Sequence, residues 1–138
     1  MITSFSGSYH PDEVDTFLIN LKKTVKRIEN LLCDKTKCEF IPVCIPEAMA
    51  IMETERLLTD LGKSGIIPRQ IIVNNVMISD ESDFCKRRKA GQLPYLQEIS
   101  KSFSPLNKVE VPMFAEEIKG VETLKKLKNA LLFDKNQV

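Results

Sequence analysis

The sequence is poor in the residues that hold metals and phosphates. It has no tryptophan, one histidine (His10), and only five glycines in 138 residues. Its four cysteines form no Cys-x-x-Cys pair, so the paired ligands of a structural zinc site are missing. No apolar run approaches the roughly 20 residues of a membrane-spanning helix. The Ser-rich start lacks a basic segment followed by an apolar one, so it does not resemble a secretory signal. We therefore expect a cytoplasmic setting with reduced thiols, and an intramolecular disulfide remains the alternative.

The charges are nearly balanced. Twenty basic and 19 acidic residues leave a net charge of +1, which gives no reason to expect nucleic acid or an anionic membrane as a partner. The short basic run at residues 86–89 has no aromatic platform beside it, so a solvated helix face is favoured. The hydrophobic content of 43% suits one modest core. We predict a single α/β domain at residues 11–134, with flexible tails at residues 1–10 and 135–138.

Apolar periodicity alternates between helical and extended patterns along the chain. The strand pattern at residues 70–77 is continuously apolar, which is typical of a strand covered on both faces of a parallel sheet. Pro42 favours a strand end or sheet edge, and Gly91 and Pro94 favour a break or kink in a helix. This order predicts a three-layer α/β arrangement in which a short parallel sheet is flanked by helices. The predicted elements are helix 12–32, strand 38–45, helix 46–63, strand 70–77, helix 84–103, strand 108–112 and helix 121–132, the last with Val121, Leu124, Leu127, Leu131 and Leu132 inward.

The tripeptide Gly62-Lys63-Ser64 matches the end of a phosphate-binding P-loop. The full pattern needs a glycine five residues before the second one, and that position is Leu57. A P-loop also follows a strand and opens a helix, whereas this tripeptide closes a predicted helix. We therefore interpret it as a helix end, terminated by Gly62 or Gly65. The remaining glycines are isolated, so the sequence shows no means of gripping a triphosphate and its Mg²⁺.

Four stretches in register resemble the arsenite-pump ATPase family, which includes the targeting factors for tail-anchored membrane proteins. Each stretch alone is weak evidence, but the order and spacing of the four stretches agree with those of the family from about residue 35 to residue 132. The resemblance implies the carboxyl-terminal part of a P-loop ATPase fold, with the P-loop and switch segments lying upstream in the family. The matching residues are Pro46-Glu47 followed by Glu53-Thr54 and Arg56; Ile72-Val73-Asn74-Asn75, with Asn75 in place of the usual glutamine; Cys85, Arg88, Gln92, Tyr95 and Leu96; and Pro112 followed by Glu117-Ile118-Lys119-Gly120.

The resemblance implies that the sheet end recognises adenine. An asparagine amide both donates and accepts, so Asn74 suits the edge of the base, and Asn75 could support it. Ligands of open α/β sheets bind beyond the carboxyl ends of the strands, where Pro112, Met113 and Phe114 also fall. From the residues alone, a strand-end asparagine that caps a loop and an ordinary strand terminus are the alternatives. The family also implies that Glu53, Glu55, Arg56 and Glu117 lie near a dimer interface.

The resemblance also carries expectations about cofactors and partners. ATP and Mg²⁺ belong to the intact family enzyme, and we assign no catalytic and no metal-binding residue in this chain. Cys85 matches the second cysteine of the family's zinc pair, but Ser82 occupies the first position, so zinc is not expected. The implied partners are a second copy or the missing amino-terminal part, and a membrane pump or a tail-anchored client. The alternative is a stand-alone interaction or dimerisation module without nucleotide binding.

Overall fold

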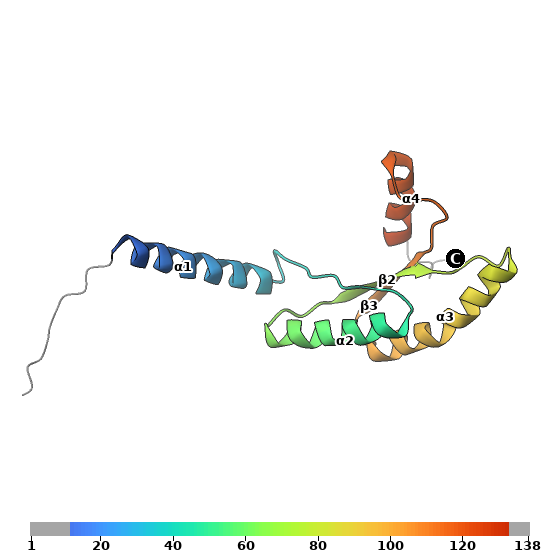
Figure 1. Ribbon diagram of the computed structural model, residues 1–138, viewed down its shortest axis with the longest axis horizontal. Helices are drawn as coiled ribbons and strands as arrows, with labels where there is room; N and C mark the ends of the chain where they lie inside the picture. The colour runs from blue at the N-terminus through green and yellow to red at the C-terminus, as the bar shows by residue number, and fades with distance from the viewer. Residues whose placement is uncertain (1–11, 133–138) are drawn as a thin grey trace, which may run out of the picture. The chain divides into compact units, whose positions relative to one another are not determined.

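The computed structural model describes residues 12–132 (Figure 1). The chain divides between Cys38 and Glu39 into two compact units, each described separately below. The predicted tails, residues 1–10 and 135–138, lie outside the described residues, and the single domain at 11–134 stays a prediction. No helix within residues 12–132 is long and apolar enough to cross a membrane.

The first unit is built on one amphipathic helix, α1 (Glu13–Cys33), which confirms the prediction for residues 12–32. Asp12 and Asp15 cap its start reciprocally. The carboxylate of Asp12 accepts from the Asp15 amide at 2.8 Å, and the Asp15 carboxylate accepts from the Asp12 amide at 3.2 Å. No residue of α1 is buried. The side chains of its apolar stripe remain 43–64% exposed: Val14, Phe17, Leu18, Leu21, Val25, Ile28 and Leu32.

The second unit contains a parallel sheet of three strands, as predicted, and their order in the sheet is β1-β2-β3. The strands are β1 (Val43–Cys44), β2 (Gln70–Val76) and β3 (Asn107–Pro112). The order of elements predicted from the sequence is confirmed throughout the described residues. The central strand β2 pairs with both neighbours. Its side chains Ile71, Val73 and Val76 are buried in the core, whereas Ile72 on the other face is half-buried.

The prediction for the first strand was too long. Residues 38–45 were expected to be extended and paired, but β1 comprises only Val43–Cys44. Pro42 has no N–H to donate, so it contributes only its carbonyl, which accepts from the Ile72 amide at 3.0 Å. Before it, Glu39 forms an ion pair with Arg69 at the amino end of β2. The segment before Pro42 therefore follows β2 without a continuous ladder.

Helices cover both faces of this sheet. Helices α2 (Ala48–Lys63) and α3 (Asp83–Ser102) lie on one face, and α4 (Gly120–Leu132) lies on the other (Figure 1). This confirms the three-layer α/β arrangement. The core lies between the sheet and the α2–α3 layer. Its buried apolar residues are Cys44, Ile51, Ile71, Val73, Val76, Ile99 and Phe103.

Helix α4 is less buried than its sequence pattern suggests. Val121, Leu124 and Leu132 were predicted to face inward, but all three are exposed, whereas Leu127 and Leu131 are half-buried. The reason is that α4 contacts the sheet through the edge strand β3. An edge strand offers a narrow surface, so the rest of the apolar stripe stays in solvent.

The helix end predicted at Gly62 or Gly65 is confirmed, whereas the break considered at Pro94 is not seen. Gly62-Lys63-Ser64 does end α2, and Gly65 is the left-handed residue, with φ of 77°. The Ile66 amide donates to the Leu61 carbonyl at 2.9 Å and the Gly65 amide to Gly62 at 3.0 Å, which is the Schellman arrangement. In contrast, no break interrupts α3 at Pro94. The helix curves along its length (Figure 1), because an exposed proline removes one hydrogen bond on the solvent side.

Candidate functional site

The carboxyl ends of β2 and β3 lie side by side. The Cα of Val76 is paired with that of Pro112, and the Met113 amide donates to the Val76 carbonyl at 2.9 Å. Asn74 and Asn75 therefore share one edge of the sheet with Pro112 and Met113, as predicted. Asn74 and Pro112 are half-buried, whereas Asn75 and Met113 are exposed. The structure thus brings polar amide groups and rigid apolar groups together at this edge.

A β-bulge shapes the end of β2. Val73 pairs with Glu110 and Val76 with Pro112, so three steps along β2 match two along β3. Asn75 supplies the extra residue in the left-handed region, with φ of 59°. Because of this bulge, both Val73 and Val76 reach the core although they are three residues apart. The two asparagines between them are turned away from the core in succession.

A glutamine from α3 holds the bulge in place. The Gln92 side chain is only 5% exposed. Its Oε1 accepts from the Met77 amide at 2.8 Å, and its Nε2 donates to the Asn75 carbonyl at 3.0 Å. The resemblance named Gln92 as a matching residue without giving it a role. The structure shows that it bridges the backbone on both sides of Val76.

Two cations of the basic run join α3 to neighbouring loops. The Arg88 guanidinium lies 3.2 Å from the Glu47 carboxylate, in the turn between β1 and α2. Lys89 Nζ lies 2.8 Å from the Asp80 carboxylate and donates to the Ile78 carbonyl at 3.3 Å. These cations remain partly exposed, so each contact contributes little alone. Together with Gln92 they connect α3 to the segments at the carboxyl edge of the sheet.

The predicted interface residues occupy two places. Glu53, Glu55 and Arg56 are exposed on α2, where Glu53 and Arg56 form a solvated ion pair at 3.4 Å. Glu117 is exposed in the segment after β3. Their assignment to an interface stays a prediction.

A small cavity lies beside the predicted base-binding segment. Its volume is about 200 Å³, and of the five residues predicted to contact adenine only Phe114 lines it. Lys126 and Glu116 contribute charged groups to its wall. This cavity therefore extends from the segment after β3 towards α4 and does not include the asparagines.

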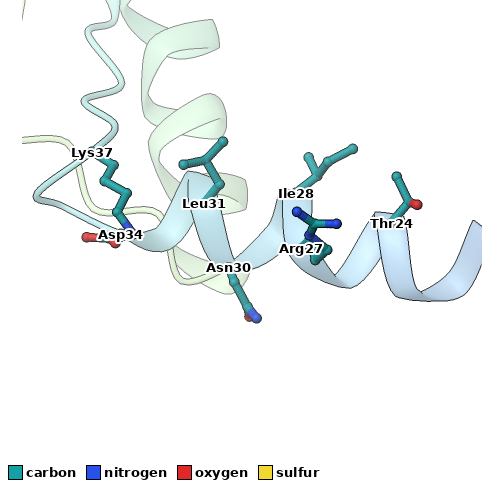
Figure 2. Close-up of a pocket in the computed structure, with 7 residues that line it drawn as sticks. All are labelled: Thr24, Arg27, Ile28, Asn30, Leu31, Asp34 and Lys37. Carbon is teal, nitrogen blue, oxygen red and sulfur yellow. Dashed lines mark ion pairs between the residues drawn. The ribbon is translucent and has the colours of Figure 1, made fainter.

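A larger hollow lies in the first unit, along the last turns of α1 and the turn that follows it (Figure 2). Its volume is about 530 Å³, and no residue predicted as a site residue lines it. Asp34 accepts from the Thr36 hydroxyl at 2.6 Å and the Thr36 amide at 3.0 Å, and lies 3.0 Å from Lys37. The two hydrogen bonds from Thr36 have the largest effect on the pKa of the Asp34 carboxyl, and together with Lys37 they lower it to about 2. The hollow is thus bordered by a carboxylate that remains charged at neutral pH.

The cysteines do not gather into a ligand set. Within residues 12–132 no group of three or more histidine, cysteine or acidic side chains could hold a metal ion. Ser82, which stands where the family has its first zinc cysteine, caps α3 by accepting from the Cys85 amide at 3.2 Å. None of the four cysteines takes part in a disulfide.

Comparison with known proteins decides the family. The model of the anion-transporting ATPase family matches residues 1–133. The chain belongs to the anion-transporting ATPase family. Similar proteins include ATPase get3 of Botryotinia fuckeliana, 31% identical over 94% of this chain, and ATPase GET3 of Ajellomyces dermatitidis, 33% identical over 91%. ATPase get3 of Pyrenophora tritici-repentis is 29% identical over 96% of the chain.

This member of the anion-transporting ATPase family spans about two fifths of the length of these relatives, 38–42% in the three cases. Family membership confirms the resemblance inferred from the four stretches. The adenine-binding roles of Asn74, Asn75, Pro112, Met113 and Phe114 stay predictions.

Proposed function

We propose that this chain supplies the adenine-binding side and part of the dimer surface of an arsenite-pump-like or tail-anchored-protein-targeting ATPase. The observation that carries the proposal is the end of β2 beside Pro112, where Asn74 points outward by strand alternation and the bulge turns Asn75 outward next to it. A half-buried amide can donate to and accept from the edge of a base at once. The rigid ring of Pro112 and the adaptable side chain of Met113 offer an apolar surface for the flat base next to it.

The same residues fit the base better than the rest of the nucleotide. Phosphates and Mg²⁺ need clustered backbone N–H groups, a lysine and oxygen ligands, and the glycines of this sequence are isolated. We therefore propose that ATP and Mg²⁺ are gripped by a further part of the intact enzyme. The 138-residue chain should bind ATP weakly and should not hydrolyse it.

The partners of the intact enzyme belong to the same proposal. A second copy or an amino-terminal ATPase part would meet the surface that carries Glu53, Glu55, Arg56 and Glu117, all of which are exposed. A membrane pump or a tail-anchored protein would be the client. A cytoplasmic setting is supported by four cysteines that form no disulfide.

Adenine recognition is tested by titrating the isotope-labelled chain with ATP and with GTP. We expect ATP to shift the Asn74 side-chain amide and the Met113 backbone amide, and GTP to shift them less. Asn74→Ala should weaken ATP binding about tenfold, because one base-directed hydrogen-bonding group is lost. Asn107→Ala, an exposed asparagine at the other end of the sheet, is the matched control and should leave binding unchanged.

Two results would contradict the proposal. If ATP and GTP shift the same resonances equally, or neither shifts those of Asn74 and Met113, this edge of the sheet does not recognise adenine. Steady turnover of ATP by the purified chain would contradict the expectation that it cannot hydrolyse the nucleotide alone.

A second candidate function, a dimerisation module, is favoured by α1. Leu18, Leu21, Val25, Ile28 and Leu32 follow one another at alternating spacings of three and four residues, and none is buried. This repeat is typical of a helix that packs along a second helix. Along one flank Asp15, Lys22 and Glu29 alternate in charge every seven residues. An antiparallel second copy shifted by one repeat would place opposite charges together, so the partner that fits is another copy of this chain.

Self-association is tested by Leu21→Glu in the middle of the stripe. A charge at this position should weaken the dimer at least tenfold, because it would be buried against the partner helix. Sedimentation over a concentration series measures the change, with Lys23→Glu on the opposite flank of α1 as the control. A wild-type chain that stays monomeric throughout the series would exclude the second candidate.

A further inference from the structure

We propose that Gln92 is a positioning residue for adenine recognition, because it holds the bulge that turns Asn75 outward beside Asn74. This inference rests on the proposed function and adds a residue that does not itself touch the nucleotide. It concerns how the chain discriminates between purine bases, and through this how tightly it binds ATP.

The Gln92 side chain bridges two backbone groups of the β2 end. Gln92 is buried and uses both ends of its amide, accepting from the Met77 N–H at 2.8 Å and donating to the Asn75 carbonyl at 3.0 Å. A buried amide is costly unless both ends are paired. Here each end meets a backbone group of opposite polarity. Only a side chain with one donor and one acceptor at this spacing satisfies both groups.

The bulge needs such a bridge. Within the sheet the Val76 carbonyl accepts from the Met113 amide at 2.9 Å. Gln92 provides a donor to the adjoining Asn75 carbonyl from outside the sheet. Asn75 has a positive φ, a conformation that costs energy for any residue with a side chain. The hydrogen bonds of Gln92 stabilise this local conformation against the straight alternative.

Straightening the bulge would turn Asn75 back towards the core face. In a regular strand successive side chains point to opposite faces, so loss of the extra residue would reverse the side chains beyond it. Asn74 lies inside the bulge, between Val73 and Asn75. Asn74 follows the core-facing Val73, so it points outward with or without the bulge. Asn75 points outward only because of its left-handed conformation, and its direction therefore depends on Gln92.

The helix that carries Gln92 is itself held in place. Arg88 pairs with Glu47 and Lys89 with Asp80, one turn before Gln92 on α3. A positioning group works only if its own support is rigid. These pairs connect α3 to two segments next to the carboxyl edge, and the packing of Ile99 into the core fixes the helix that carries Gln92.

The test replaces Gln92 by methionine, which keeps the length of the side chain and removes both hydrogen-bonding groups. We expect the ATP affinity of the chain to fall about tenfold and its preference for ATP over GTP to fall by a similar factor. The ¹³C shifts of Asn75 should move away from left-handed values at the same time. Gln97→Met is the matched control, since Gln97 is exposed on the same helix. It should change none of these quantities.

A second variant covers the case in which Gln92→Met does not fold. Gln92→Glu keeps the acceptor for the Met77 amide but places a carboxylate oxygen against the Asn75 carbonyl. At low pH the buried carboxyl is protonated and can donate to the Asn75 carbonyl, so the fold and the base preference should be retained. At higher pH the carboxylate cannot donate, and the base preference should be lost. A purely structural role predicts a different pattern, in which stability falls while the ATP-to-GTP preference and the Asn75 shifts of the folded protein are unchanged.

The outcomes separate this inference from the function on which it rests. If the wild-type chain binds ATP with adenine-dependent shifts at Asn74, and folded Gln92 variants keep the same preference, Gln92 is not a positioning residue. If the wild-type chain shows no adenine-dependent shift, the proposed function fails and this inference fails with it.

Discussion

Replacing Ile71 by alanine should destabilise the second unit by about 2–5 kcal/mol, the range found when a buried isoleucine is cut back to a methyl group. Ile71 is 0% exposed and lies in β2, the central strand, which pairs with strands on both sides. The loss has two parts, namely the transfer of the missing carbons and the cavity left behind. A domain of this size is stabilised by only about 5–15 kcal/mol, so the variant should be near the limit of folding.

The measurement is urea unfolding of the wild type and the variant. Backbone amide signals of β2 and β3 should report the second unit, because the circular dichroism of α1 would mix in the first. Ile78→Ala is the control, since Ile78 is exposed just after β2 and should change stability by less than about 0.5 kcal/mol. Equal effects of the two substitutions would contradict the position of β2 at the centre of the core.

The thiol of Cys44 should react with a soluble disulfide reagent at least about a thousandfold more slowly than that of Cys33, because reaction requires opening of a stable core. Cys44 is 2% exposed in β1, whereas Cys33 is exposed at the end of α1. Burial raises the pKa of the Cys44 thiol, so less of the reactive thiolate forms at a given pH. The burial of the Cys44 thiol and its raised pKa both slow the reaction. Raising the pH should reduce only the part of the slowing that comes from the raised pKa.

Mass spectrometry of the labelled chain identifies which cysteine has reacted at each time. Cys44→Ser should leave the fast labelling phase unchanged and remove the slowest labelling phase. Cys33→Ser should remove a fast labelling phase. Adding urea below the unfolding transition should accelerate Cys44 selectively. Labelling of Cys44 as fast as that of Cys33 would show that β1 is not packed against α2 and the sheet.

Much of the fold could be predicted because it depends on local patterns. The continuous apolar run of β2 predicts cover on both faces. The structure covers one face with α2 and α3, whereas α4 on the other side contacts the sheet through β3 and leaves Ile72 half-buried. The end of α2 follows from Gly65, whose left-handed conformation most other residues avoid. In contrast, the length of β1 depended on which backbone groups β2 could reach, and the exposure of α4 on the width of an edge strand. Neither is a property of the segment alone.

The site could be predicted only in outline. The positions of Asn74 and Pro112 beyond parallel strand ends follow from the order of elements. The bulge does not, because it depends on the relative register of β2 and β3. Gln92 did leave a signal. Gln92 lies four residues before Leu96, and Leu96 lies three residues before Ile99. This spacing places the polar Gln92 side chain on the same face of α3 as the buried Ile99. A polar residue on such a stripe indicates a buried backbone group that needs a partner.

The sheet order β1-β2-β3 has a consequence for synthesis on the ribosome. Each strand lies beside the one made just before it, and the helix between them has already emerged when the next strand appears. No strand has to enter between two that are already paired. The second unit can therefore assemble in the direction of translation, from β1 outward, with every unfinished stage exposing only one growing edge.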